Sequence, residues 1–291
     1  MVISASIAQA ETTGKEALTQ QLMKVSGLEH QIAQIPDQIF AGLADRRPTM
    51  SAAQYDTVLA AFKEAFHVQR LTFNVSARLE KNLDQDTMQA ALTWLRSDLG
   101  MKITGLEEAA STTQGIQRFE AYAQKLETHP PSPARLQLAE RLDAVGHSTE
   151  TNVNIALGTM LAVATGIDAA QVEERRIGAE ALKAQINLQQ PTLIQTYRPI
   201  VISSLLYVYQ GLNNADLNRY IGFLDSQSGR EYQATVNAAL IGALSDSSER
   251  LGTILAGAVN ALRRKKGSKP EHPAFPSFAL KSSCNSPRRL D

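Results

Sequence analysis

The stretch FLDSQSGREYQ (Phe223–Gln233) interrupts a helical pattern with Ser-Gln-Ser-Gly, so it decides how the helices on either side are joined. Ser226 or Ser228 can cap the helix that follows, and Glu231 stands three residues after Ser228, as a capping box requires. Gly229 permits a close backbone approach or an unusual dihedral angle. The stretch therefore predicts a bend between two helices.

The stretch WLRSDLGMKIT (Trp94–Thr104) repeats this pattern 129 residues earlier, with Ser97 and Gly100 at the positions of Ser226 and Gly229. Other apolar pairs share the offset of 129 residues: Leu79 with Val208, Leu83 with Leu212, Met88 with Leu217, and Leu92 with Ile221. Further upstream the offset is 120 residues, where Leu22 and Val25 match Leu142 and Val145. The pattern predicts a duplicated helical unit.

The segment HPPSP (129–133) is the clearest boundary, because three prolines within four positions cannot continue a helix. The predicted organisation is a remnant of a secretory signal at 1–10, helical repeat unit 1 at 11–128, helical repeat unit 2 at 129–262 and a disordered basic tail at 263–291.

Composition and helical spacing predict an all-α, multi-helix bundle. Of the 291 residues 43% are hydrophobic and only 5% aromatic, while Ala, Leu and Gln, which favour helices, are abundant. Ser51 with Gln54, and Asp168 with Gln171, are predicted capping boxes at two helix starts. The apolar run Ile155–Ile167 is too short to span a bilayer and predicts a buried helix.

The formal net charge of zero conceals a division. Residues 263–291 carry eight Lys or Arg against two acidic residues, a net charge of +6, whereas the first 262 residues carry 21 basic against 27 acidic, a net charge of −6. An acidic body is a poor nucleic-acid binder. The basic cluster has two interpretations, a solvated terminus or a weak contact with an anionic membrane. It consists of Arg263, Arg264, Lys265 and Lys266.

The first ten residues, MVISASIAQA, are apolar and end in Ala8-Gln9-Ala10, the small-x-small pattern before a signal cleavage site. They are interpreted either as the end of a longer signal, with Glu11 as the first mature residue, or as an ordinary terminus. The first interpretation predicts export from a bacterial cytoplasm, to the periplasm or beyond.

The run ADLNRYIGFLDSQSGREYQATVNAAL (215–240) resembles the exported bacterial proteins classified as domain of unknown function 2059. The residues that carry the resemblance are Ile221, Phe223, Ser226, Gly229 and Tyr232. It covers roughly 195–245, with a weaker counterpart at 66–112. The resemblance implies an all-helical, signal-bearing envelope protein, but no activity, cofactor or catalytic residue.

Reactive side chains offer little. A nucleophilic Ser226 would need a base, and the five histidines provide no recurring partner. No metal-binding spacing is present. The adjacent pairs Glu107-Glu108 and Glu173-Glu174 are interpreted as solvated surface, because neighbours in sequence point in different directions on a helix. We therefore expect no catalytic site, cofactor or metal, although an unrecognised hydrolase stays an alternative.

Tyrosines gather in one part of the chain, and their hydroxyls are either donors in an apolar groove for a lipid or peptide, or ends of packed core residues. They are Tyr197, Tyr207, Tyr209, Tyr220 and Tyr232. The leading hypothesis is an exported, non-enzymatic envelope protein that acts through contacts with an unknown protein partner. The alternative is a periplasmic carrier of a small hydrophobic ligand in the tyrosine-lined groove.

Overall fold

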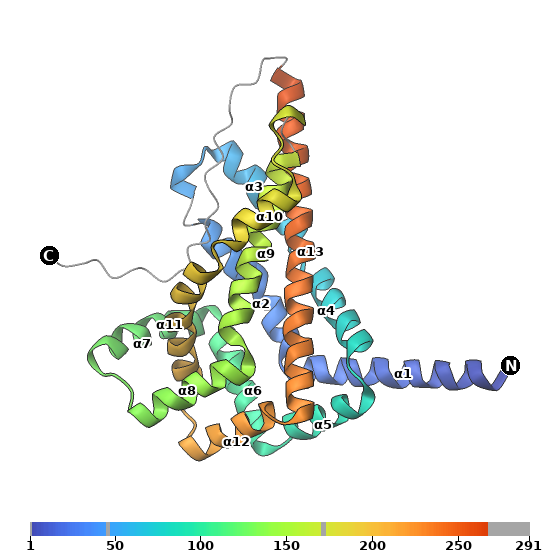
Figure 1. The fold of residues 1–291 in the computed structure, drawn as a ribbon, viewed down its shortest axis with the longest axis vertical. Helices are drawn as coiled ribbons and strands as arrows, with labels where there is room; N and C mark the ends of the chain where they lie inside the picture. The colour runs from blue at the N-terminus through green and yellow to red at the C-terminus, as the bar shows by residue number, and fades with distance from the viewer. Residues whose placement is uncertain (1, 45–46, 170–172, 267–291) are drawn as a thin grey trace.

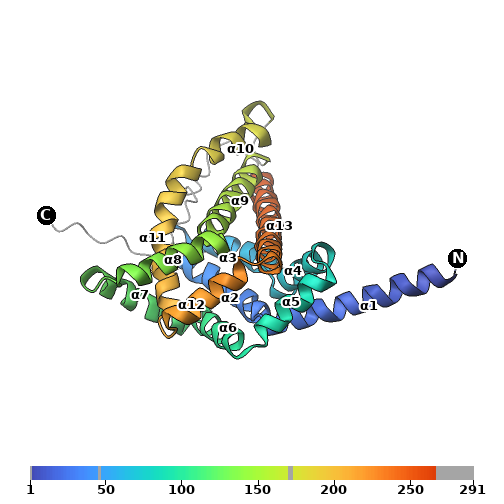
Figure 2. The ribbon, with the colours of Figure 1, turned by 60° about the horizontal axis from the view of Figure 1, so that its bottom comes forward.

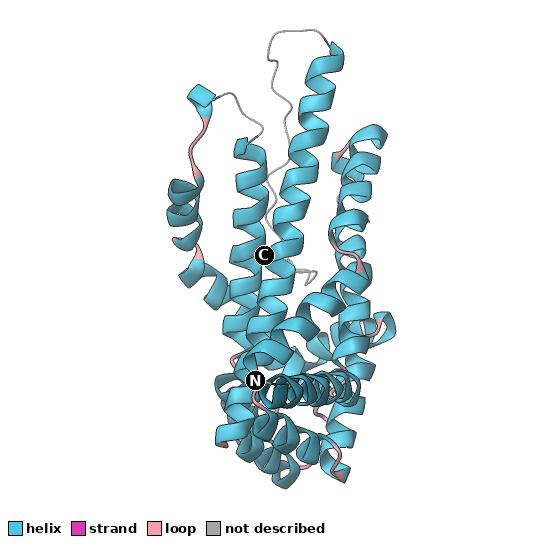
Figure 3. Cartoon of the chain, turned by 90° about the vertical axis from the view of Figure 1, so that its right-hand side faces the viewer, coloured by secondary structure: helices cyan, strands magenta, loops and turns pink. Residues whose placement is uncertain are grey.

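A computed structural model describes residues 2–44, 47–169 and 173–266. Throughout these ranges the regular structure is helical, and no strand is present (Figure 3). The predicted all-α class is confirmed. Within the same ranges, no helix combines the length and the apolar character needed to cross a membrane.

The order of elements in the first half of the chain recurs in the second (Figure 1). The first half contains α1 (Val2–Val25), α2 (Leu28–Ala44), the 3-10 helix η1 (Arg47–Thr49), α3 (Ala52–Ala65), α4 (Val68–Asn82), α5 (Gln85–Leu95), α6 (Asp98–Ser111) and α7 (Thr113–Thr128). The second half contains α8 (Pro133–Gly146), α9 (Ser148–Ala169), the 3-10 helix η2 (Glu173–Arg175), α10 (Ala179–Asn187), α11 (Gln190–Val208), α12 (Asn214–Leu224) and α13 (Gln227–Lys266).

Equivalent joints share their backbone conformation. Gly27 joins α1 to α2 with a φ of 72°, and His147, 120 residues later, joins α8 to α9 with a φ of 52°. Asp84 caps α5 through the Thr87 N–H, and Asn213, at the offset of 129, caps α12 in the same way. The duplication itself stays a prediction, which these joints support.

Local sequence signals explain most of the helix ends. Ser51 and Gln54 form the predicted capping box at the start of α3. The Pro-rich segment 129–133 separates α7 from α8. Pro36 and Pro199 lie inside α2 and α11 without ending either helix.

Two predicted boundaries are wrong. Asp168 does not open a helix but lies near the end of α9, and its carboxylate accepts hydrogen bonds from the N–H groups of Ile177 (2.7 Å) and Gly178 (3.0 Å). The capping pattern was local, whereas α9 continues because it packs along α13. The predicted tail also begins too early, since α13 extends to Lys266 through four basic residues that favour helices near a C-terminus. The rest of the predicted tail lies outside the described residues.

Each half of the chain contributes a helix to the core of the other (Figure 2). The first core combines α1, α2, α4 and α5 with α13, while the second combines α8, the end of α11 and α12 with α6. The two bends, α5 to α6 and α12 to α13, lie at the same end of the molecule. Trp94 and Phe223, equivalent residues of the two copies, stack there with centroids 4.7 Å apart and planes at 7°. The helix after each bend thus crosses into the opposite unit.

Candidate functional site

The two bends have the same hydrogen bonds. Ser226 Oγ accepts a hydrogen bond from the Gly229 N–H at 3.1 Å and donates one to the carbonyl oxygen of Phe223 at 2.6 Å. Ser97 Oγ accepts from the Gly100 N–H, also at 3.1 Å, and donates to the carbonyl three residues before it at 2.6 Å. Each serine therefore ties the end of one helix to the start of the next.

The glycines are needed for a close approach and not for their dihedral angles. A Cβ at Gly229 would overlap the carbonyl oxygen of Phe223, and a Cβ at Gly100 would overlap that of Trp94. Neither glycine has a positive φ. Any side chain would push apart the two helices that the serine joins.

The alternative cap at Ser228 is absent. Ser228 makes no hydrogen bond within the described ranges, and the Glu231 carboxylate instead accepts from Thr87 Oγ1 at 3.0 Å and Gln227 Nε2 at 3.1 Å. Because Glu231 faces the other unit, a partner distant in sequence replaces the local one.

A third bend of this kind escaped the sequence analysis. Thr112 joins α6 to α7: its Oγ1 accepts from the Gly115 N–H at 3.0 Å and donates to the carbonyl oxygen of Ala109 at 2.9 Å. A Cβ at Gly115 would overlap that same carbonyl oxygen. The pattern Ser/Thr-x-x-Gly, rather than Ser-x-x-Gly, would have found it.

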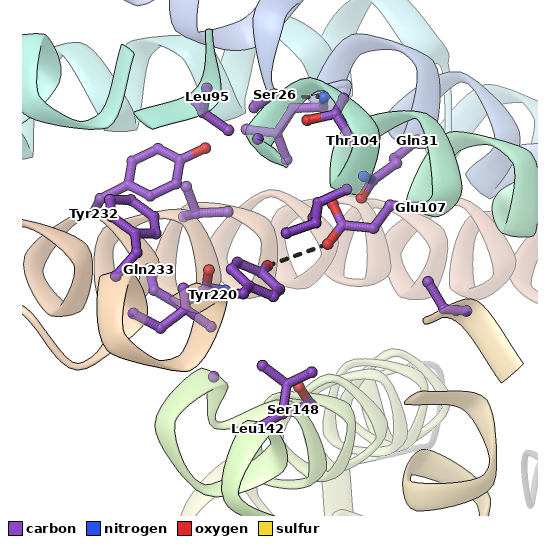
Figure 4. A pocket seen from close by; sticks show the side chains of 18 of the residues that line it. Ser26, Gln31, Leu95, Thr104, Glu107, Leu142, Ser148, Tyr220, Tyr232 and Gln233 are labelled. Carbon is purple, nitrogen blue, oxygen red and sulfur yellow. Dashed lines mark hydrogen bonds between the residues drawn. The ribbon is translucent and has the colours of Figure 1, made fainter. Parts of the chain in front are cut away.

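The bends hold open a cavity of about 320 Å³ between the two units (Figure 4). Its walls come from α2, α5, α6, α9, α11, α12 and α13 and from the ends of α1 and α8. Leucine, isoleucine and valine side chains form much of the lining, interrupted by hydroxyl and amide groups. A volume of this size lies at the lower end of the range for small-molecule sites.

Three of the five predicted groove tyrosines meet at this cavity. Tyr209, Tyr220 and Tyr232 line it, and the rings of the first two lie edge to face with centroids 5.7 Å apart. Tyr207 packs instead against the rings of Phe119 and Tyr122, between α11 and α7. Tyr197, earlier in α11, is half-buried and does not line the cavity either. The predicted groove is therefore smaller than the sequence cluster.

Glu107 corrects the interpretation of the Glu107-Glu108 pair as solvated surface. The Tyr209 hydroxyl donates a hydrogen bond to Glu107 Oε1 at 2.6 Å, and the Tyr220 hydroxyl donates to the same oxygen at 3.2 Å (Figure 4). Glu107 is partly exposed because it borders the cavity, yet its carboxylate is enclosed by protein. The bend at Ser97 turns this face of α6 towards the second unit, which a sequence read locally does not reveal.

One signal was present in the sequence. Gly100, Ile103, Thr104, Glu107 and Ser111 follow one another at three- and four-residue steps, and all of them line the cavity. Such spacing places residues on one face of a helix. Glu107 therefore shares its face with buried residues, whereas Glu108 does not.

Burial sets the protonation of these groups. It raises the pKa of Glu107, hydrogen bonds from the two phenols oppose that effect, and the charge of Glu108 adds to it. Burial also raises the pKa of Tyr209 and of Tyr220 well above the ordinary value, and that of Tyr232 to about 12. The phenols therefore stay protonated and act as hydrogen-bond donors at neutral pH.

Trp94 completes the wall, and it is the one tryptophan of the chain. Its Nε1 is buried without a hydrogen-bond partner. Its ring lies nearly parallel to that of Tyr220, with centroids 6.4 Å apart, in addition to its stack on Phe223. A tryptophan in this position reports on the contents of the cavity through its fluorescence.

The described part of the chain holds no group of three or more His, Cys, Asp or Glu side chains placed to bind a metal ion. Compared with protein-family models, with curated proteins and with solved structures, the chain matches none of them.

Proposed function

We propose that this protein binds a small, partly apolar molecule in the cavity between its two units, without catalysing a reaction. The observation that carries the proposal is a cavity of about 320 Å³ that encloses a carboxylate with no ion-pair partner, beside aromatic rings. Burial of a charge without a counter-ion costs free energy, and packing alone does not require it. Proteins keep such groups where a ligand uses them.

The arrangement of serines supports a role in binding rather than catalysis. Ser226 lies outside the cavity lining, and its hydroxyl is engaged by the backbone on both sides of the bend. Ser26 and Ser148 do line the cavity, but no histidine does. A serine nucleophile needs a base within hydrogen-bond reach.

Native mass spectrometry of protein purified gently from its own host tests this proposal. We expect a retained small molecule, whose removal changes the fluorescence of Trp94 because the indole borders the cavity. A protein that carries nothing, and whose Trp94 fluorescence responds to no amphipathic compound in a titration series, would contradict it.

We also propose that the protein is exported and belongs with the bacterial envelope proteins that it resembles. The uncharged apolar start supports this, as does the projection of the beginning of α1 away from the body, where a peptidase can reach the chain (Figure 1). Protein exported from its host should begin at Glu11. An intact Met1 on the exported material would contradict the predicted cleavage.

Contact with a protein partner is the second candidate function, favoured by exposed apolar side chains around α10. Leu188 is 77% exposed, Ile177 58% and Ile194 37%. A protein that co-purifies with the wild type and is lost from Leu188→Asp would support this candidate. Membrane contact through the basic residues 263–266 also stays a proposal, whose test is salt-sensitive binding to anionic vesicles. The side chains of these residues lie outside the described part.

A further inference from the structure

Glu107 stands alone as a charged residue in the cavity. Among the residues that line it, no Lys, Arg or His faces the carboxylate, and no described ion pair includes Glu107. The other polar lining groups are hydroxyls, amides and the indole of Trp94. An anionic occupant would therefore meet an uncompensated negative charge, and a cationic occupant would neutralise it.

The two oxygens of Glu107 differ in their hydrogen bonds. Both phenols, of Tyr209 and Tyr220, donate to Oε1. Oε2 accepts none from the described residues, and it is not enclosed like the buried atoms that lack a partner. The phenols thus fix the carboxylate in one orientation and leave Oε2 open towards the cavity for a donor on a ligand.

The duplicated architecture shows that packing does not demand an acid here. Val236 stands at the position of the second unit that corresponds to Glu107, by the offset of 129 residues, and it lines the same cavity. A valine therefore suits one wall of the pair, and the acid is peculiar to the other. Burial also raises the pKa of Glu107, and a bound cation would lower it again.

We propose that the ligand of this cavity is an organic ammonium ion with an apolar body, whose charged nitrogen binds Glu107 Oε2 while the body packs against the aromatic and aliphatic wall. This assignment rests on the proposed binding function and names its ligand class. An apolar cavity of roughly 150 Å³ holds a benzene molecule. The larger volume here accommodates a ring with a short aminoalkyl chain.

Three probes of nearly equal shape test the proposal by titration of Trp94 fluorescence at neutral pH: 2-phenylethylammonium, 2-phenylethanol and phenylacetate. We expect the ammonium ion to bind roughly tenfold or more tightly than the alcohol, as a charge-assisted hydrogen bond provides, and phenylacetate to bind most weakly. The wild-type comparison is decisive without any variant. Equal affinity for the ammonium ion and the alcohol, or tighter binding of phenylacetate, would overturn the ligand class while the binding function stands.

Glu107→Gln and Glu108→Gln form a matched pair of variants, because each removes one negative charge from α6 and only the first acts at the cavity. Glu107→Gln should reduce the affinity for the ammonium ion to that for the alcohol and leave the alcohol unchanged. Glu108→Gln should keep the preference for the ammonium ion. Loss of the preference in Glu108→Gln alone would overturn the assignment to Glu107. If folded wild-type protein binds none of the three probes, both this proposal and the proposed function fail.

Discussion

Gly229 shows how one missing side chain sets the join between two helices. Its amide proton reaches Ser226 Oγ, and the carbonyl oxygen of Phe223 occupies the space that a Cβ would take. A methyl group there must displace the backbone of α12 or α13. The position therefore tolerates no side chain, although its φ is ordinary.

We predict that Gly229→Ala lowers the free energy of unfolding by about 1–3 kcal/mol, the usual effect of forced overlap in a packed region. Gly222→Ala is the matched control, because this exposed glycine of α12 has no atom within 4 Å of an added Cβ. The control should raise stability by about 0.4–1 kcal/mol, because alanine restricts the unfolded chain. Urea denaturation of both variants measures the difference. Equal effects of the two substitutions would show that the approach at the bend is not restrictive.

Glu107 should make stability depend on pH in the direction opposite to that of a paired carboxylate. Because burial raises its pKa in the folded state, the folded protein binds a proton more readily than the unfolded chain does. Glu107 therefore contributes a loss of stability as the pH rises from the ordinary value of 4.5 through the raised pKa. Of the groups around it, Tyr209, Tyr220 and Tyr232 have raised pKa values, and the charge of Glu108 raises that of Glu107 further.

We predict that Glu107→Gln is more stable than the wild type at neutral pH, and that the difference disappears below about pH 4.5. Each pKa unit by which burial shifts Glu107 corresponds to about 1.4 kcal/mol. Glutamine can still accept the hydrogen bonds of Tyr209 and Tyr220. Melting temperatures of the two proteins across the pH range test this, with Glu108→Gln as the control. A difference that grows as the pH falls would mean that the folded state stabilises the ionised form.

The pair α9 and α13 forms the longest contact between helices in the described part of the chain (Figure 1). The two helices meet where glycine faces glycine. A Cβ on Gly252 would lie 2.6 Å from the carbonyl oxygen of Ala162 and 3.2 Å from the Cα of Gly166. The absence of side chains at this crossing lets the backbones approach, and apolar residues on either side pack as a result.

We predict that Gly252→Ala forces α9 and α13 apart and destabilises the protein by about 1–3 kcal/mol. Gly257, five residues later on the exposed side of α13, has open space around an added Cβ. Gly257→Ala should therefore leave stability unchanged or raise it slightly. Thermal melts followed by circular dichroism compare the pair. If both variants melt like the wild type, the helices do not depend on this close approach.

The exchange of helices between the units makes the whole molecule one folding unit. The first core includes Tyr232, Val236 and Ala239 from α13, and the second includes Leu99 and Ile103 from α6. Neither half of the chain can bury its apolar face alone. Cutting the chain should therefore remove cooperativity rather than yield two stable domains.

We predict that residues 1–128 and 129–291, produced as separate chains, show no cooperative unfolding alone and regain it when mixed. The cut lies in the exposed Pro-rich connection between α7 and α8, so it breaks no helix. Melting curves of each piece and of the mixture decide the matter, and the intact chain is the reference. A single piece that unfolds cooperatively would show that its own core suffices.

Features that depend on neighbouring residues were predictable from the sequence. Helix class, the serine bends, the caps and the break at 129–133 follow from local hydrogen bonding and periodicity, which act over a few residues. The tyrosine cluster was predicted too broadly. Tyr207 and Tyr209 are close in sequence yet contact different helices, because positions two apart on a helix point in different directions.

The sequence by itself determined where helices begin, end and bend, and that the pattern recurs at a fixed offset. Only the tertiary structure decided that α6 and α13 cross into the opposite units, that Trp94 stacks on Phe223, and that Glu107 faces a cavity. The physical reason is range. A cap or bend is stabilised by contacts within one helical turn, whereas the surroundings of Glu107 depend on residues more than 100 positions away, whose approach is set by the packing of both cores together.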